Sequence, residues 1–215
     1  MYHWVTDKEY LKITYGTCAD IVNQLVQKLK NDGIEASMNV VGSKKRNMVT
    51  QNSTEAIDFD FNLLIENANR FREGDLKEAV KKAFNEVLAN NGWGDCEDST
   101  SALTTEQRVL KKGNKTPFSI DVCIVSYDGL GQLRRLIHEK TGNTWWDRYY
   151  WNVVPNSQKL WEREEHLKPD YWIEVRDAYL EKKNMYLKKN DYNHPSFVCY
   201  VEAVNEVYNK VRRYL

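Results

Sequence analysis

Two aspartates, Asp58 and Asp60, lie two residues apart in the apolar segment 56–65 and have a spacing that suggests chemistry. Side chains of a β-strand alternate between its two faces, so both carboxylates point to one face, about 7 Å apart along the strand. The apolar neighbours, such as Phe59, point to the other face. Two carboxylates on a buried strand repel each other and are costly to take out of water, and a divalent cation would remove that cost.

A third acid, Asp121, lies in the apolar segment Phe118–Val125. If this segment pairs beside the strand of Asp58 and Asp60, the three carboxylates meet at one place. Ligands that offer only oxygen suit Mg²⁺ or Mn²⁺, with substrate phosphates completing the coordination. Two such ions, about 4 Å apart, can stabilise the attacking and leaving oxygens of a phosphoryl transfer. Taken alone, Asp121 also fits a structural carboxylate that only accepts hydrogen bonds.

The turn Gly42-Ser43 precedes the acidic pair and is a candidate phosphate-binding element. Its backbone N–H groups and the Ser43 hydroxyl can hold phosphate oxygens, and glycine lets the backbone approach them closely. Lys44, Lys45 and Arg46 follow at once and can neutralise added negative charge. The same three residues fit a solvated loop equally well.

The elements that must position these residues follow from apolar periodicity and turn residues. A helix is predicted from Asp20 to Gly33, after an aromatic and polar arm or short helix in residues 1–16. A second helix is predicted from Asp75 to Gly92, and helices fill the chain from Pro169 onward. The predicted strands are residues 34–41, 56–65, 105–111, 116–126, 132–139 and 148–154. This order of helices and strands indicates an α+β fold.

Composition limits the class of protein. With 215 residues, 41% apolar and 29% charged, the chain has enough apolar surface for a folded core. Lys and Arg equal Asp and Glu at 31 each, so the total charge does not indicate a dedicated nucleic-acid or membrane binder. No apolar run reaches the roughly 18 residues of a membrane span. The four cysteines are far apart, which favours free thiols and a cytoplasmic location.

Several other residues leave their interpretation open. In the aromatic stretch Trp145–Trp151, we expect about half of the rings to pack in the core, with base stacking as the alternative. Arg134 and Arg135 fit a charged strand edge or the lining of a groove. We expect the acidic loop 95–98 to lie at the surface, and we assign no role to His138.

The order of the three motifs resembles the nucleotidyltransferase superfamily of DNA polymerase β. That family shows hG[GS], then [DE]h[DE]h, then h[DE]h, where h is an apolar residue. Here the motifs are Val41-Gly42-Ser43, Asp58-Phe59-Asp60-Phe61 and Ile120-Asp121-Val122. The resemblance covers about residues 18–126. The long spacing between the first two motifs and the C-terminal tail resemble the branch of oligoadenylate synthetases and bacterial cyclic-oligonucleotide synthetases.

The resemblance implies a fold and a reaction. The fold would be a mixed, mainly antiparallel sheet flanked by helices, with a nucleotidyltransferase core in residues 1–155 and a helical segment in residues 156–215 packed on it. Gly42 and Ser43 would bind the triphosphate of a nucleotide, most simply ATP, assisted by Lys44 and Arg46. The enzyme would transfer a nucleoside monophosphate to an unidentified acceptor and release pyrophosphate.

The resemblance also implies roles for the three acids. Asp58 and Asp60 would bind two Mg²⁺ or Mn²⁺ ions, and Asp121 would complete the catalytic metal site and help to activate the attacking hydroxyl. A module of the same fold that binds nucleotide or RNA without turnover is the alternative. A nuclease-type carboxylate site, which would not need the Gly-Ser turn, is a third interpretation. The sequence indicates no membrane association and no obligate protein partner.

Overall fold

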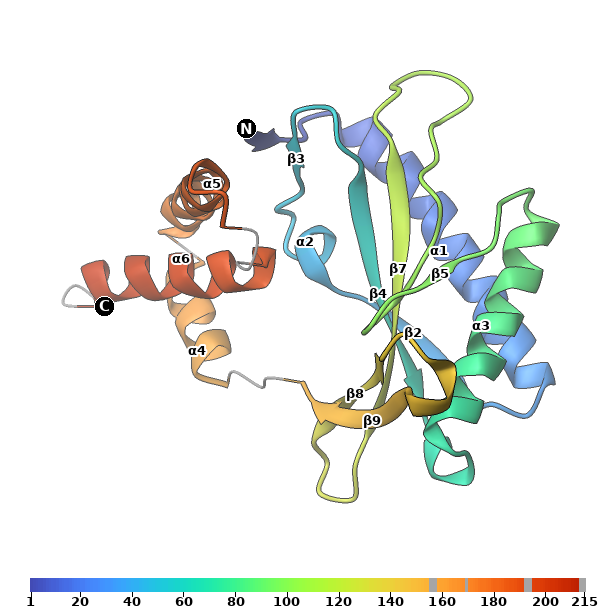
Figure 1. Ribbon diagram of the computed structural model, residues 1–215. Coiled ribbons are helices and arrows are strands. Elements are labelled where there is room, and N and C mark those ends of the chain that lie inside the picture. Colours follow the sequence, from blue (N-terminus) through green and yellow to red (C-terminus); the bar gives the residue numbers. More distant parts are fainter. Residues whose placement is uncertain (155–157, 169, 192–194, 213–215) are drawn as a thin grey trace. The chain divides into compact units, whose positions relative to one another are not determined.

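The computed structural model describes residues 1–154, 158–168, 170–191 and 195–212 (Figure 1). Contacts divide the chain into two compact units, which are Met1–Val5, Asn47–Thr54 and Pro155–Leu215 in the first, and Thr6–Arg46 and Glu55–Val154 in the second. The boundary predicted at residues 155–156 lies outside the described residues. The division into two domains therefore stays a prediction, but the grouping of residues 1–5 and 47–54 with the C-terminal helices was not anticipated.

Among the described residues, seven strands of the second unit form one mixed sheet, with the order β2-β4-β7-β6-β5. The edge of β7 away from β4 pairs with β6 at one level and with β8 at another, and β8 pairs with β9. Strands β4 and β7 run parallel, whereas β2–β4, β6–β7 and β7–β8 are antiparallel. The strands are β2 (Ala36–Val40), β4 (Ile57–Ile65), β5 (Glu97–Asp98), β6 (Leu103–Thr104), β7 (Phe118–Tyr127), β8 (Leu133–Glu139) and β9 (Arg148–Val153).

Two long helices, α1 (Lys8–Asn31) and α3 (Glu73–Asn90), contact each other and lie on one side of this sheet (Figure 1). Helix α1 begins at Lys8 and not at Asp20, because Asp7 Oδ1 accepts the N–H of Tyr10 at 2.9 Å and caps it. Its Tyr15 ring packs on the apolar face of β4. The short elements of this unit are α2 (Gly42–Lys45) and two single 3₁₀ turns, Ala68–Arg70 and Thr144–Trp146.

The first unit joins the N-terminus to the C-terminal helices through polar and aromatic contacts. The backbone N–H of Tyr2 donates to Asn184 Oδ1 at 2.7 Å. The Arg176 guanidinium lies 4.2 Å from the centre of the Trp4 ring, and Lys183 Nζ lies 3.9 Å from that of Tyr2. The elements are β1 (Tyr2–Trp4), β3 (Thr50–Asn52), which pairs with β1, α4 (Gln158–Leu167), α5 (Trp172–Lys188) and α6 (Ser196–Val211).

Several predicted elements are wrong in detail. Helix α4 lies within the helical segment implied for residues 156–215, but the apolar pattern indicated helices only from Pro169, a residue outside the described part of the chain. The predicted strand 105–111 is replaced by the short β6 and one isolated bridge between Arg108 and Phe118. No helix in the described part of the chain combines the length and apolarity needed to cross a lipid bilayer.

Candidate active site

The acidic residues lie on one face of the two central strands. Along β4, buried residues alternate with more exposed ones, so Phe59 is fully buried while Asp58 is exposed and Asp60 is half-buried. The Tyr15 ring stacks on Phe61 at 6.2 Å between centroids, which places α1 on the apolar face. The predicted separation of the carboxylates from the apolar side chains is confirmed.

The parallel pairing of β4 with β7 brings the third acid to the same place. Asp60 lies directly opposite Asp121, and Asp58 lies opposite Ser119. Neighbouring residues in paired strands project to the same face, so the carboxylates of Asp60 and Asp121 are cross-strand neighbours. The sequence could name these residues, but only the register of the two strands brings them together.

Two hydroxyl groups donate hydrogen bonds to the carboxylates of Asp58 and Asp121, and neither was identified from the sequence. Ser119 Oγ donates to Asp58 Oδ1 at 2.5 Å, and Thr104 Oγ1 donates to Asp121 Oδ1 at 2.6 Å. Ser119 lies two residues before Asp121 on the same face, so the two-residue period could have identified it. Thr104 could not be identified in that way, because it comes from the short strand β6, which has no clear signal.

Burial and mutual repulsion dominate the electrostatics of the acidic residues. Burial raises the pKa of Asp60 to about 6, and the carboxylates of Asp121 and Asp58 add to that rise. The guanidinium groups of Arg46 and Arg135 act in the opposite direction. Burial also raises the pKa of Asp121, although the hydrogen bond from Thr104 partly offsets it. Holding neighbouring carboxylates together without a cation destabilises the folded protein, so such a cluster indicates a functional site.

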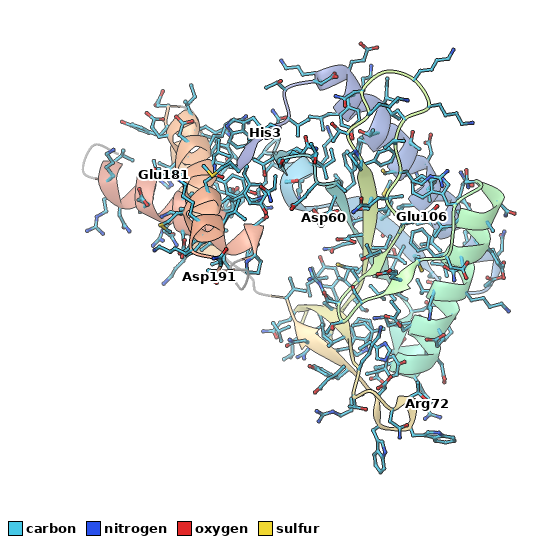
Figure 2. The ribbon with its side chains drawn as sticks, turned by 45° about the horizontal axis from the view of Figure 1, so that its top comes forward. His3, Asp60, Arg72, Glu106, Glu181 and Asp191 are labelled. Carbon is cyan, nitrogen blue, oxygen red and sulfur yellow. The ribbon has the colours of Figure 1, made fainter. Side chains whose placement is uncertain are left out.

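Gly42 is required by its contact with Asp60 as well as by its conformation. Its φ angle is +64°, in the left-handed region, and a Cβ atom there would lie 2.7 Å from Asp60 Cγ and overlap Asp60 Oδ2. The α2 turn therefore sits directly against the acidic residue (Figure 2). The Val41 N–H donates to the Asp60 carbonyl at 2.9 Å and fixes this approach.

The basic residues after Gly42 do not act alike. Arg46 Nη1 donates to the Gly42 carbonyl at 3.1 Å and stays beside the acidic face. Lys44 Nζ instead lies 5.1 Å from the centre of the Tyr15 ring. Ser43 and Lys45 complete the α2 turn. Arg46 is thus a stronger candidate than Lys44 for a charge at this site, and phosphate binding by either residue stays a prediction.

The donor set suits a hard divalent cation. Asp58, Asp60 and Asp121 present carboxylate oxygens on one face, and the raised pKa of Asp60 is relieved by a nearby positive charge. Among the described residues, no three acidic, histidine or cysteine side chains already converge as a metal site. The ligand types fit Mg²⁺ or Mn²⁺, and the binding itself stays a prediction.

A second buried polar cluster lies elsewhere in this unit. Lys77 Nζ contacts Asp98 Oδ1 at 2.7 Å, and the His138 ring nitrogens contact Asp98 at 2.9 Å and Asp147 at 3.1 Å. Despite burial, Lys77 and His138 lower the pKa of Asp98. The expectation that loop 95–98 is a surface feature is therefore wrong for Asp98, whose side chain is 7% exposed.

The aromatic stretch also differs from expectation. Trp145 and Trp146 are 91% and 72% exposed, and Tyr150 is exposed as well. Tyr149 is half-buried because its ring stacks on His138 at 4.2 Å between centroids. No ring in residues 145–151, all of which the structure describes, is fully buried, so the prediction that half of them pack in the core is wrong.

The mixed sheet, its parallel central pair and the three acids define the fold of polymerase β-like nucleotidyltransferases. Comparison with solved structures supports this fold. CdnC of Escherichia coli MS115-1, determined with ATP, matches with a TM-score of 0.57 and 15% sequence identity, over 95% of this chain and 61% of CdnC. DncV of Vibrio cholerae, a cyclic AMP-GMP synthase determined with the linear intermediate 5′ pppA(3′,5′)pG, matches with a TM-score of 0.56 and 13% identity.

The chain therefore has the nucleotidyltransferase fold in the form found in these bacterial proteins, as the resemblance in its motifs implied. The DncV match covers 80% of this chain and 47% of DncV, so the chain spans only part of the length of both proteins. No protein-family profile matches the chain, and no curated protein matches its sequence. At this level of identity, the shared property is the fold.

Proposed function

We propose that this protein is a metal-dependent nucleotidyltransferase, which transfers a nucleoside monophosphate from a nucleoside triphosphate to an acceptor and releases pyrophosphate. The observation that carries the proposal is the pairing of Asp60 with Asp121 across the parallel strands, beside the α2 turn that contacts Asp60. A structural sheet has no need of three carboxylates on one face, whereas phosphoryl transfer needs such a group to hold the cations that accompany a triphosphate.

Each residue has a distinct task in this proposal. Asp58, Asp60 and Asp121 would hold Mg²⁺ or Mn²⁺, which supplies charge neutralisation and polarises the phosphate when bound. The hydrogen bonds from Ser119 and Thr104 fix two of these carboxylates in orientation. Asp121 accepts the proton of the attacking hydroxyl, a task that its raised pKa favours.

The triphosphate is placed against the Gly-Ser turn. Gly42 has no side chain, so phosphate oxygens approach the backbone and the Ser43 hydroxyl beside Asp60. Arg46 supplies a positive charge at the same place, while Lys44 is held against Tyr15 and contributes less. ATP is the proposed donor, in line with the ATP in the CdnC structure. A cytoplasmic location, where the four buried free cysteines stay reduced, belongs to the same proposal.

The test is pyrophosphate release from each of the four nucleoside triphosphates with Mg²⁺ or Mn²⁺, in the presence of a panel of acceptors that includes the nucleotides themselves. We expect release with at least one nucleotide, and its loss in Asp60→Asn. Asp75→Asn is the matched control, because Asp75 is 72% exposed and lies on α3. Wild-type protein that binds nucleotide but releases no pyrophosphate would identify the catalytically silent module instead.

A further inference from the structure

The face of the sheet that carries the three aspartates extends along β4 and β7 beyond them, where Cys123 and Val125 pack with Ala102 in a small apolar cluster. On β4, the side chain of Asn62 follows Asp58 and Asp60 at two-residue intervals and shares their face, and its cross-strand neighbour on β7 is Cys123. On β8, Arg135 is paired with Val125, which shares the face of Asp121 by the same two-residue period. Asn62 and Arg135 thus flank β7 on the side of the sheet that carries the acids.

Both residues keep polar atoms that the protein does not use. Asn62 Oδ1 and Arg135 Nε are buried and have no hydrogen-bond partner among the described residues. Buried polar atoms in folded proteins are nearly always paired, so two orphans on one face indicate a missing polar partner. One orphan is a hydrogen-bond acceptor and the other is a donor on a permanent cation.

The neighbouring residue Arg134 shows that this is not a general property of β8. Arg134 Nε donates to Asp128 Oδ2 at 2.7 Å and forms an ordinary ion pair near the surface. Arg135 forms no ion pair within the described part of the chain, although its charge acts on both Asp60 and Cys123. Its guanidinium therefore faces the acidic cluster with hydrogen-bonding capacity to spare.

The position of Arg135 is opposite to that of the Gly-Ser turn. In the strand order β2-β4-β7, with β8 beyond β7, the α2 turn follows β2 and lies level with Asp60, whereas Arg135 lies across β7 and level with Val125. The charges of both arginines lower the pKa of Asp60, with Arg46 on the side of α2 and Arg135 on the other side of β7. The proposed function places the leaving pyrophosphate on the side of α2, which leaves the side of Arg135 for the second substrate.

We propose that Arg135 forms an oxyanion-binding subsite that positions a phosphate group of the second, attacking substrate. This inference rests on the proposed function, which places the leaving pyrophosphate at Gly42 and Ser43. A guanidinium presents a rigid fork of donors that matches two phosphate oxygens. Asn62 Oδ1 is an acceptor, so it suits a hydroxyl group of the same substrate and not the phosphate. Arg135 is a positioning residue in this proposal, because the reacting hydroxyl is held by Asp121.

The test compares phosphorylated with neutral ligands and needs no turnover. The full-length protein is first saturated with a non-hydrolysable ATP analogue and Mg²⁺. Each of the four ribonucleoside monophosphates and each matching nucleoside is then titrated by calorimetry. For at least one base, we expect the monophosphate to bind about tenfold or more tightly than its nucleoside, and this preference to vanish in Arg135→Gln. Arg135→Lys keeps the charge without the fork and should retain only part of the preference.

Arg134→Gln is the matched control and should keep the full preference, because that side chain is committed to Asp128. Circular dichroism establishes that each variant folds. A wild-type protein that binds nucleoside and monophosphate equally would overturn the subsite. So would an Arg135→Gln variant that loses affinity for the ATP analogue while keeping the preference for monophosphate. Failure of the wild-type protein to bind the ATP analogue or to release pyrophosphate would instead contradict the proposed function.

Discussion

The close approach of Gly42 to Asp60 gives a prediction that separates backbone strain from a direct contact. In Gly42→Ala, the alanine must keep the φ of +64°, and its methyl group overlaps the Asp60 carboxylate. The left-handed conformation costs an alanine about 1–2 kcal/mol. Relief of the overlap moves a flexible side chain off its rotamer, which adds about 1 kcal/mol. We therefore expect a loss of about 2–3 kcal/mol in the free energy of unfolding.

Gly33→Ala is the matched control for this substitution. Gly33 has a φ of +79°, and a Cβ atom there meets nothing within 4 Å. It should lose only the conformational part, about 1–2 kcal/mol, and keep its activity. Gly42→Ala should in addition lose about 100-fold in pyrophosphate release, since a catalytic group displaced by about 1 Å costs a factor of that order.

A double-mutant cycle identifies the contact without any activity assay. Asp60→Ala removes the two atoms that lie closest to the methyl group introduced by Gly42→Ala. In that background, Gly42→Ala should therefore lower the free energy of unfolding by no more than Gly33→Ala does. Urea denaturation followed by circular dichroism measures the four free energies, and a coupling of about 1 kcal/mol exceeds the usual additivity error. If Gly42→Ala costs the same in both backgrounds, the Asp60 carboxylate does not lie against the turn and the reasoning fails.

Three further outcomes follow from the charges. Because the pKa of Asp60 is raised from 3.8 to about 6, its contribution to stability is present below about pH 4 and lost as the pH rises through 6. Asp60→Asn should therefore stabilise the metal-free protein by about 3 kcal/mol near pH 8 in urea denaturation, and give no gain near pH 4. Mg²⁺ should raise the melting temperature of the wild type but not of Asp60→Asn. Lys77→Ala should cost about 3–5 kcal/mol because it leaves Asp98 buried without its cation, while exposed Lys82→Ala should cost less than about 0.5 kcal/mol; equal losses would refute the buried pair.

The central part of the fold was predictable because its signals are local. The alternation of Asp58, Phe59 and Asp60 predicts β4 and its two faces, and the apolar run around Asp121 predicts β7. The N-terminal extension of α1 was hidden because its cap, Asp7, lies in an aromatic segment without a clear period. The grouping of residues 1–5 with α5 and α6 depends on contacts such as Tyr2 with Asn184, which no local pattern encodes.

The candidate site shows the same limit at the level of single residues. The three acids could be named in the sequence because carboxylates in apolar strands are unusual. Thr104 and Arg135 could not, because their places beside Asp121 and Val125 depend on which residues pair across the strands. A charge-rich strand such as β8 is usually an exposed edge, and that general rule concealed the difference between Arg134 and Arg135.

Arg46 and Arg135 both act electrostatically on Asp60, and their charges affect the binding of anions at this site. With its three acids ionised and Arg46 and Arg135 charged, the site carries a net negative charge, which repels a nucleotide polyanion. A divalent cation reverses this sign, so the proposed donor and its cation depend on each other for binding. The charges of Arg46 and Arg135 offset part of the repulsion among the acids without a metal. In the two proposals, the same residues that offset this repulsion also bind the phosphate groups of the two substrates.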